Sequence, residues 1–326
     1  MEKPKIAFYW CASCGGCEES IVDLAEKILD VVNLVDIVFW PVALDFKIKD
    51  VETMPDKSVT VSFINGGIRL EEHEYVVKLL RKKSQLLVAY GACSSWGGVP
   101  GLANLFSREE ILRCVYQETP TVDNLNNTRP KTKLNIEDIV TLELPEFLPR
   151  LLPIDLIVDV DYYVPGCPPT PEVTWKAIEI LLSGNLPPKG SVIGASDRSL
   201  CYECHLNETK PEKVLIKEIK RPHEVIADPE KCLLTQGLVC LGPVTRGGCG
   251  ALCVKAAMPC TGCFGQLDEV IDYGGKAISY FASILDYYNE EEVEKALSRL
   301  PDPMGTFYRY SLPASRLRGK IKIMER

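Results

Sequence analysis

Cysteine is the residue that most constrains this chain. Fourteen cysteines occur in 326 residues, a fraction below the roughly 8–10% of small disulfide-rich scaffolds but too high for incidental use in a core. The first residues, Met1 to Lys5, carry no apolar signal segment, cleavage site or twin arginine, which predicts a cytoplasmic protein. In a reducing cytosol, this many thiols indicate metal binding or redox chemistry rather than disulfides.

Composition excludes several classes of protein. Hydrophobic residues make up 46% of the chain and charged residues 25%, values typical of folded globular proteins and not of disordered ones. The length predicts about two domains. The net charge of −8 argues against nucleic acid and anionic lipid as partners. No apolar run reaches the roughly 18 residues needed to span a bilayer.

The first half alternates strand-like and helix-like segments. Apolar residues recur at helical spacing over residues 21–29, 75–80 and 173–182. Between them, short runs rich in β-branched and aromatic residues predict the strands Lys5–Trp10, Val35–Trp40, Val59–Ile64, Leu86–Tyr90 and Leu156–Val160. This alternation predicts an α/β fold, a doubly wound parallel sheet with helices on its faces.

Two stretches interrupt this pattern. Residues Gln117 to Leu152 are polar and rich in Asn and Pro, too long for a simple connection, and predict an insertion that packs on something else. Residues Gly184 to Gly190 have the composition of a domain boundary. Beyond them the periodicity fades, although residues 270–285 and 290–300 predict helices. The second half is therefore predicted to be small, irregular and α-rich.

Three Gly-rich loops of the first half each follow a predicted strand and carry Cys14 with Cys17, Cys93, and Cys167. Because the carboxyl ends of parallel strands meet at one sheet edge, these thiols are expected to gather there. Four thiolates are a complete ligand set for a 4Fe-4S cluster. The alternatives are a redox dithiol for the Cys14–Cys17 pair and a buried apolar role for the other two cysteines.

The second half carries eight further clustered cysteines, which are enough for two four-cysteine sites. They are Cys201, Cys204, Cys232, Cys240, Cys249, Cys253, Cys260 and Cys263. Their spacing differs from that of two-cluster bacterial ferredoxins. Paired Cys-x-x-Cys units could instead hold structural zinc. The spacing alone therefore leaves iron–sulfur and zinc sites open.

Other polar and aromatic residues have simpler interpretations. Cys11 could compete as a ligand with the neighbouring pair, and Cys114 is predicted to pack in the core. His205 could ligate iron or zinc, but with Cys201 available it is expected to be solvated or to donate a hydrogen bond to a ligand. Glu18 and Glu19 fall where the first helix begins and complement its dipole, with a proton relay as the alternative. The following aromatic residues are predicted to lie in the core: Tyr9, Trp10, Trp40, Tyr162 and Tyr163.

Taken together, the cysteine motifs resemble those of the small subunit of nickel–iron hydrogenases. The motifs are Cys14-Gly-Gly-Cys17, Gly91-Ala-Cys93, Pro165-Gly-Cys167-Pro-Pro, Cys240-Leu-Gly-Pro243 and Pro259-Cys260-Thr-Gly-Cys263. Within that family the chain looks most like the gamma chain of the cytoplasmic methyl-viologen-reducing, deazaflavin-non-reducing type. That type works beside heterodisulfide reductase in methanogens and some other anaerobes.

The resemblance implies a fold and a set of cofactors. Residues 1–190 would form a flavodoxin-like domain and residues 191–326 an iron–sulfur domain. Three 4Fe-4S clusters would be held as follows: the proximal by Cys14, Cys17, Cys93 and Cys167; the medial by Cys249, Cys253, Cys260 and Cys263; the distal by Cys201, Cys204, Cys232 and Cys240. The membrane-type relatives have a histidine at the position of Cys201 and lack the Cys253 ligand.

The resemblance also implies the activity and the partners. The chain would relay electrons and hold no hydrogen-activating site, because hydrogen is split at a nickel–iron centre in a separate large subunit. The acceptors would be a 2Fe-2S subunit and then the flavin subunit of heterodisulfide reductase.

Three rival interpretations remain at this point. A related quinone-oxidoreductase subunit uses adjacent cysteines at the first motif, which this chain lacks. The small subunit of a deazaflavin-reducing hydrogenase has a more ferredoxin-like second domain. From a different class, a zinc-and-dithiol interaction protein would be catalytically inert.

Overall fold

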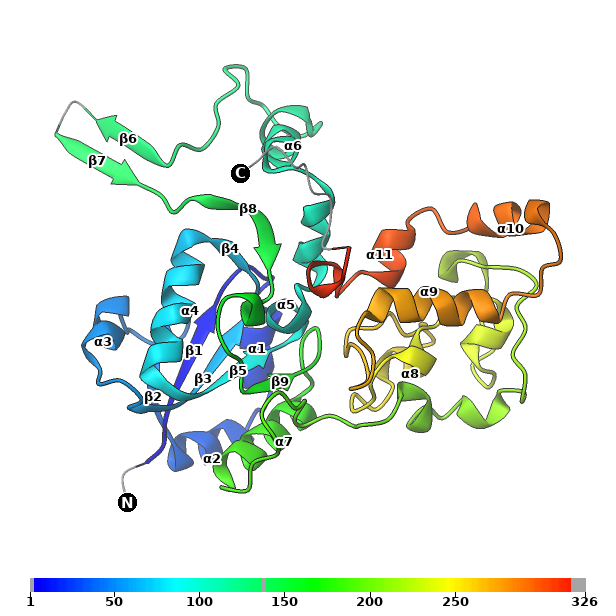
Figure 1. The fold of residues 1–326 in the computed structure, drawn as a ribbon, viewed down its shortest axis with the longest axis horizontal. Coiled ribbons are helices and arrows are strands. Elements are labelled where there is room, and N and C mark those ends of the chain that lie inside the picture. The colour runs from blue at the N-terminus through cyan, green and yellow to red at the C-terminus, as the bar shows by residue number, and fades with distance from the viewer. Residues whose placement is uncertain (1–2, 137–138, 318–326) are drawn as a thin grey trace.

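A computed structural model describes residues 3–136 and 139–317. The centre of the protein is a five-stranded parallel sheet with the order β2-β1-β3-β5-β9 (Figure 1). Its strands are β1 (Lys5–Trp10), β2 (Asp36–Phe39), β3 (Val59–Asn65), β5 (Ser84–Tyr90) and β9 (Tyr162–Val164). Counted along the chain this order is 2-1-3-4-5, the flavodoxin-like doubly wound order. The predicted α/β fold is confirmed.

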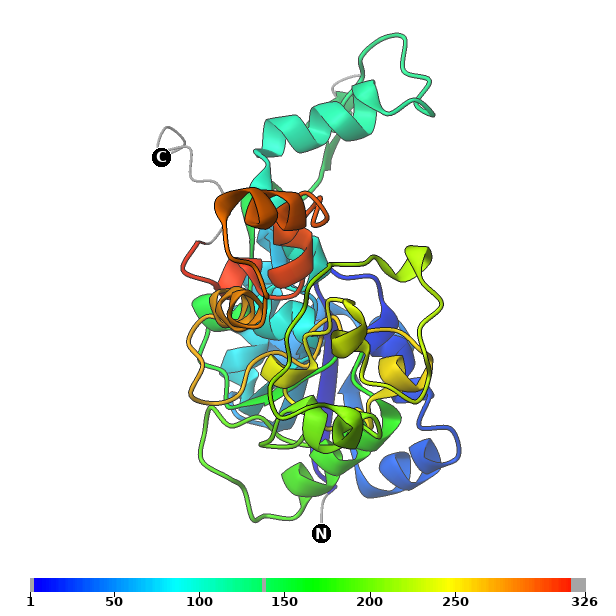
Figure 2. The ribbon, with the colours of Figure 1, turned by 90° about the vertical axis from the view of Figure 1, so that its right-hand side faces the viewer.

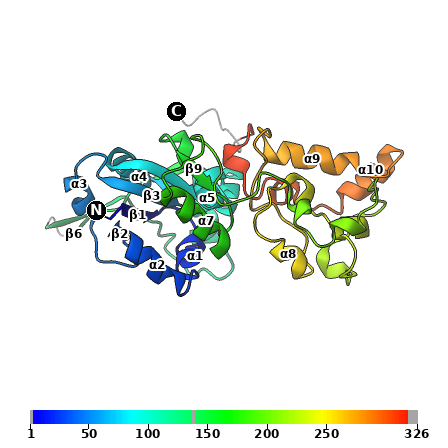
Figure 3. The ribbon, with the colours of Figure 1, turned by 90° about the horizontal axis from the view of Figure 1, so that it is seen from below.

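Helices cover both faces of the sheet (Figure 3). On one face lie α1 (Gly16–Val22), α2 (Lys27–Leu34) and α7 (Pro171–Leu182), and on the other lie α3 (Ile48–Thr53) and α4 (Glu71–Lys83). Successive side chains of a strand point to opposite faces. In β1, Phe8 therefore packs under the first set of helices and Ala7 under the second.

The fifth strand was predicted in the wrong place. Residues 156–160 do not form a strand: a 3-10 turn, Ile154–Leu156, is followed by irregular chain, and β9 begins at Tyr162. Pairing starts at Asp161, whose backbone N–H donates to Leu87 O (2.9 Å) and whose carboxylate accepts from Leu87 N (2.8 Å). The apolar run before it packs against the α4 face of the sheet instead, so β-branched composition alone misplaced the strand.

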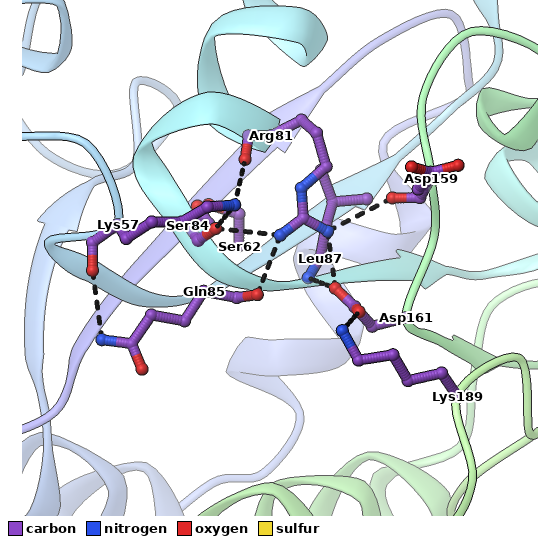
Figure 4. A network of polar contacts seen from close by, with 9 residues as sticks. All are labelled: Lys57, Ser62, Arg81, Ser84, Gln85, Leu87, Asp159, Asp161 and Lys189. Carbon is purple, nitrogen blue, oxygen red and sulfur yellow. Dashed lines mark hydrogen bonds and ion pairs between the residues drawn. The ribbon is translucent and has the colours of Figure 1, made fainter.

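A polar network fixes the amino ends of β5 and β9 (Figure 4). The Asp161 carboxylate forms ion pairs with Arg81 (2.5 Å) and Lys189 (2.6 Å). Arg81 also donates to the carbonyl oxygens of Ser84 (2.9 Å) and Gln85 (2.8 Å). Burial alone would raise the pKa of Asp161, but the hydrogen bonds from Lys189 and Arg81 bring it below its ordinary value. These charges lie at the sheet end opposite to the cysteine loops.

The segment between β5 and β9 contains the predicted insertion. After α5 (Ala92–Trp96) and a 3-10 segment (Val99–Leu105) come α6 (Arg108–Arg113), a π-helical turn (Cys114–Glu118), the hairpin β6 (Lys133–Ile136) and β7 (Val140–Glu143), and β8 (Phe147–Leu152). Strand β8 pairs with β4 (Ile68–Leu70). Both hairpin strands are exposed along their length. Cys114 is exposed too, so its predicted place in the core was wrong.

The second half has short helices, 3-10 turns and an apolar cluster of its own (Figures 1 and 2). The helices are α8 (Leu252–Lys255), α9 (Tyr273–Ser283), α10 (Glu290–Leu297) and α11 (Pro303–Phe307). The 3-10 turns are Leu200–Tyr202, Asn207–Thr209, Pro222–Glu224, Leu233–Gln236, Gly242–Val244 and Leu312–Ala314. The two helices predicted here are confirmed.

The last described residues return to the first half. The 3-10 turn that contains Pro313 lies beside α5 (Figure 1). A Cβ atom on Gly97 would lie 2.2 Å from Pro313 Cγ, and one on Gly101 would lie 2.4 Å from it. The N–H of Gly98 donates to Tyr310 O at 3.1 Å. The chain beyond Cys93 is thus closed by residues near the other end of the sequence.

Two local predictions need correction. The apolar pattern over residues 21–29 is divided between α1 and α2, because Ala25 has a left-handed backbone (φ 52°). Trp10 is 38% exposed rather than in the core, whereas Trp40 and Tyr162 are buried as predicted. Across the described part of the chain, every helix is too short or too polar to cross a membrane.

Candidate metal centres

The first cysteine group lies at the carboxyl edge of the sheet, as predicted. Cys14 and Cys17 follow β1, Cys93 lies in α5 directly after β5, and Cys167 follows β9. Backbone hydrogen bonds join the last two loops: Gly91 N donates to Val164 O (2.8 Å) and Ala92 N to Gly166 O (2.7 Å). The parallel sheet therefore brings residues far apart in sequence to one edge.

The four thiols of this group lie close enough for their charges to act on one another. Burial raises the pKa of Cys17 far above its ordinary value, and the neighbouring thiols Cys93, Cys167 and Cys14 raise it further. Burial, with Cys167 and Cys14, raises the pKa of Cys93 to about 12. Such thiols stay protonated unless a cation compensates the thiolate charge, which a bound metal does.

Two glycines make room for these sulfur atoms. A Cβ atom on Gly91 (φ 88°) would lie 2.4 Å from Cys17 Sγ, and one on Gly98 (φ 59°) would lie 2.4 Å from Cys93 Sγ. Both distances are far below van der Waals contact. Any side chain at either position would displace the thiol, so the loops require glycine for close backbone approach as well as for their positive φ angles.

The second group surrounds a cavity in the second half. Cys201, Cys204, Cys232 and Cys240 all line it, together with apolar side chains and Lys210. Burial raises the pKa of Cys201 to about 11, while the nearby Lys210 ammonium opposes that increase. Gly242 lies between two of the sulfur atoms, since a Cβ atom there would be 3.6 Å from Cys240 Sγ and 3.7 Å from Cys201 Sγ.

The third group is formed by the remaining cysteines. Burial raises the pKa of Cys263 to about 12, and the thiols of Cys249, Cys167 and Cys253 contribute. Cys260 is 6% exposed. Its pKa is raised well above the ordinary value by burial and then by Cys240 and Cys263. Cys260 thus faces both the third group and the second.

The three groups form a row. The Cys167 thiol of the first group helps to raise the pKa of Cys263 of the third, and a hydrogen bond from the Cys167 backbone to Cys263 lowers it. At the other side, the Cys240 thiol of the second group helps to raise the pKa of Cys260, and Leu241 N donates to Cys260 O at 2.9 Å. The resemblance to the hydrogenase small subunit had given this third group the medial position, between the other two.

The donor sets suit iron–sulfur clusters. Four thiols are a complete ligand set for a 4Fe-4S cluster and also for a structural zinc ion. Cys201, Cys204, Cys232 and Cys240 line one mostly apolar cavity, and glycines leave room beside sulfur atoms of the first group.

The remaining candidate residues lie outside the three groups. Cys11 is buried on the α4 face of the sheet, whereas Cys17 lies on the α1 face. Burial and then Glu72 raise the Cys11 pKa. His205 is exposed, as expected.

Glu18 lies in the first turn of α1, as predicted for a complement to the helix dipole, and it is also buried (5% exposed). Its carboxylate accepts hydrogen bonds from Trp40 Nε1 and Asn65 Nδ2. Burial raises its pKa despite both bonds. Neither partner is near Glu18 in sequence, so the sequence held no signal for this contact. Glu19 is exposed, as predicted.

Comparison with known proteins places this arrangement in a family. Residues 14–181 match the family described as NADH ubiquinone oxidoreductase, 20 Kd subunit. The chain is 43% identical over 320 residues to the iron-sulfur subunit of the F420-non-reducing hydrogenase of Archaeoglobus profundus, with 97% of this chain and 98% of the relative covered. The chain belongs to this family of hydrogenase subunits. The matching subunit of the F420-non-reducing hydrogenase of Methanothermobacter marburgensis is 38% identical over 327 residues, which cover 98% of each chain.

A solved structure agrees in fold. A chain of the [NiFeSe] hydrogenase from Desulfovibrio vulgaris Hildenborough superposes with a TM-score of 0.51 and 16% identity, covering 82% of this chain and 95% of that one. Together these findings confirm the resemblance that the cysteine motifs indicated: this protein is a hydrogenase small subunit of the F420-non-reducing type.

Proposed function

We propose that this chain is the electron-transfer small subunit of its hydrogenase and carries three 4Fe-4S clusters. The observation that carries the proposal is the set of three cysteine groups, of which the second lines one cavity and is joined to the third by the hydrogen bond from Leu241 N to Cys260 O at 2.9 Å. A relay needs redox centres in sequence between a donor and an acceptor, and a row of ligand sets supports that arrangement. When bound, a 4Fe-4S cluster accepts and releases single electrons.

The ligand sets follow the predicted motifs. Cys14, Cys17, Cys93 and Cys167 would hold the proximal cluster; Cys249, Cys253, Cys260 and Cys263 the medial one; and Cys201, Cys204, Cys232 and Cys240 the distal one. The chain's other residues exclude water and permit close approach. Apolar side chains line the distal cavity, and Gly91 and Gly98 leave room for the proximal sulfur atoms.

The finer assignment extends to domains and partners. We divide the chain into a sheet domain, residues 1–190, and an iron–sulfur domain, residues 191–326, supported by their separate apolar clusters. Electrons would enter from a nickel–iron large subunit. They would leave through a 2Fe-2S subunit to the flavin subunit of a heterodisulfide reductase. The family membership supports the first partner, and the sequence resemblance supports the other two.

Metal analysis tests the proposal. The chain would be purified with its partners under anaerobic conditions, and iron, acid-labile sulfide, zinc and nickel would be measured together. About twelve irons and sulfides in this chain are expected, from three four-iron clusters. About four irons with two zincs would contradict the proposal and make the second half a zinc module. An intact complex without nickel would contradict a nickel–iron partner.

Matched cysteine variants locate the proximal cluster. Cys93→Ala removes a buried proximal thiol and should lower the iron content by about four per chain. Cys114→Ser is the control, because Cys114 is exposed and lies outside the three groups, and it should retain all the iron. A folded Cys93→Ala chain with an unchanged proximal electron paramagnetic resonance signal would overturn the assignment.

A further inference from the structure

A cationic cavity of about 350 Å³ lies in the second half of the chain. It is built from five segments, and four basic side chains line it: Lys220, Arg221, Arg299 and Arg309. We call it the cationic cavity. The whole chain carries a net charge of −8. Four basic side chains around one cavity are therefore unusual for this acidic protein.

Two of the four cations already have acidic partners. Arg299 forms an ion pair with Glu224, and Lys220 lies 3.7 Å from the Glu218 carboxylate. The lining also includes Asp302, whose carboxylate accepts a hydrogen bond from Gly305 N at 2.8 Å and so caps α11. The carboxylates of Glu224, Glu218 and Asp302 therefore already have partners within the chain.

Within residues 3–136 and 139–317, the other two cations have no acidic partner. In the described part of the chain, the guanidinium of Arg221 has no hydrogen-bond acceptor, and Arg309 donates only its Nε, to Gly305 O at 2.8 Å. Arg221 is exposed and Arg309 is half-buried. An unpaired guanidinium offers several donors to a carboxylate. Both arginines are thus available to an anionic ligand.

Apolar side chains complete the lining of the cationic cavity. Val239, Leu241, Met258 and Leu300 contribute to it, and Met258 is 49% exposed. Apolar surface beside arginine and methionine is typical of protein–protein contacts. The combination fits a polypeptide segment that carries both carboxylates and apolar side chains.

The cavity also lies against the cysteine row. Val239 and Leu241 flank Cys240, and Pro259 and Thr261 flank Cys260; all four flanking residues line the cavity. A segment bound there would contact the junction at which the second and third cysteine groups meet. That position suits a protein that exchanges electrons with this chain.

We propose that the cationic cavity docks an acidic, amphipathic segment of the protein that accepts electrons from this subunit. The inference rests on the relay function proposed above. The carboxylates of the segment would pair with Arg221 and Arg309, and its apolar side chains would cover Met258. Charge pairing at a rim accelerates association and is weakened by salt.

The test measures binding of the electron-accepting subunit that co-purifies with the hydrogenase. That subunit would be separated and titrated against the remaining complex at low and high salt. Arg221→Glu should weaken binding about five-fold or more at low salt, with a smaller effect at high salt. Lys49→Glu is the matched control, since Lys49 is an exposed lysine on α3 and changes the net charge equally. It should bind like the wild type.

A second variant guards against misfolding. Arg309→Gln removes the other unpaired cation without adding negative charge and should weaken binding in the same direction. Cluster absorbance and the rate of hydrogen-dependent reduction of a viologen dye should match the wild type in all variants, because neither requires the acceptor protein.

Several outcomes would overturn the inference. Equal binding by Arg221→Glu and Lys49→Glu, release of the large subunit in place of the acceptor, or stabilisation by inorganic phosphate without any loss of acceptor binding would each do so. Failure of the relay proposal is a separate result. It would appear as missing iron or missing dye reduction in the wild type itself.

Discussion

The carboxylate of Glu203 accepts a hydrogen bond from the backbone N–H of Gly248 at 2.9 Å. The same oxygen accepts a second one from Gly250 N at 3.0 Å. Glu203 lies between Cys201 and Cys204, and the two glycines flank Cys249. A side chain from the loop of the second cysteine group therefore holds the loop that carries Cys249 of the third group.

Removal of this carboxylate should loosen the Cys249 loop. Glu203→Ala leaves two backbone donors to water and should lower the free energy of unfolding by about 1 kcal/mol, the usual scale for exposed charge-assisted bonds. Glu203→Gln keeps an acceptor oxygen and should lose less. Urea unfolding of the iron-loaded complex, followed by cluster absorbance, measures both. Equal losses of unfolding free energy in the two variants would show that the charge of Glu203, and not its acceptor oxygen, provides the stabilisation.

The Gly91→Ala variant should fail to assemble the proximal site. Its Cβ atom would lie 2.4 Å from Cys17 Sγ, so the thiol must move away from the other three. About four irons per chain should be lost. Gly190→Ala is the control, because Gly190 has the same φ of 88° but no atom within 4 Å of a Cβ atom there. A Gly91→Ala chain with full iron would show that the loop can shift.

Substitution of Gly97 should lower the stability by more than backbone strain alone would, because the new side chain would also collide with Pro313. Gly97→Ala combines a positive φ with a Cβ atom 2.2 Å from Pro313 Cγ, and should cost about 2–4 kcal/mol of stability. Gly184→Ala also has a positive φ but open space around it, and should cost about 1 kcal/mol. Thermal unfolding compares the two variants. Similar melting temperatures would contradict tight packing of the proline.

The two cations of Asp161 should contribute unequally. The Arg81 side chain is 18% exposed and the Lys189 side chain 71% exposed, so water screens the lysine pair more strongly. Arg81 also donates to three carbonyl oxygens of the chain, those of Asp159, Ser84 and Gln85. Arg81→Gln should therefore cost about 2 kcal/mol or more, and Lys189→Gln less than about 1 kcal/mol. Denaturant midpoints at neutral pH test the order, which the reverse ranking would refute.

His73 should make the protein less stable as the pH falls. Burial lowers the pKa of His73 to about 4, and its Nδ1 accepts the N–H groups of Arg69 and Leu70, both at 3.3 Å. The unfolded chain takes up a proton near pH 6.5 but the folded chain does not. Stability should thus be complete above about pH 6.5 and fall below it by up to about 1.4 kcal/mol per pH unit.

Replacement of that histidine tests the assignment. His73→Asn keeps a side-chain acceptor but does not titrate, so its stability should change less between about pH 7.5 and pH 5.5. Denaturant unfolding at the two pH values gives the comparison. Parallel pH dependence in variant and wild type would assign the effect to another group.

Local sequence signals predicted most of the sheet. β1 begins and ends as predicted, because a compact alternating run next to a Gly-rich loop leaves little freedom in placement. The fifth strand was misplaced because the chosen run was the more β-branched one. The contacts that decide the register, between Asp161 and Leu87, join residues remote in sequence. The predicted burial of Cys114 was wrong for a similar reason, because an apolar helical pattern does not reveal whether another part of the protein covers it.

The resemblance carried by the cysteine motifs gave the members of each group and their order, with the third group as the medial one. Spacing identifies the loops, and the parallel sheet rule places the first group. Spacing alone does not give the order, which depends on contacts in the irregular second half such as the hydrogen bond from Leu241 N to Cys260 O. Glu18 and Glu203 were missed as structural residues because a carboxylate beside a cysteine motif looks solvated until its distant partners are known.

The packing of Pro313 on Gly97 and Gly101 sets a constraint on biosynthesis. A ribosome makes the loop after Cys93 long before it makes the proline that covers it. The loop therefore gains its contacts with Tyr310 and Pro313 only after these residues have been made, so a chain interrupted before residue 310 would lack the cover over this loop.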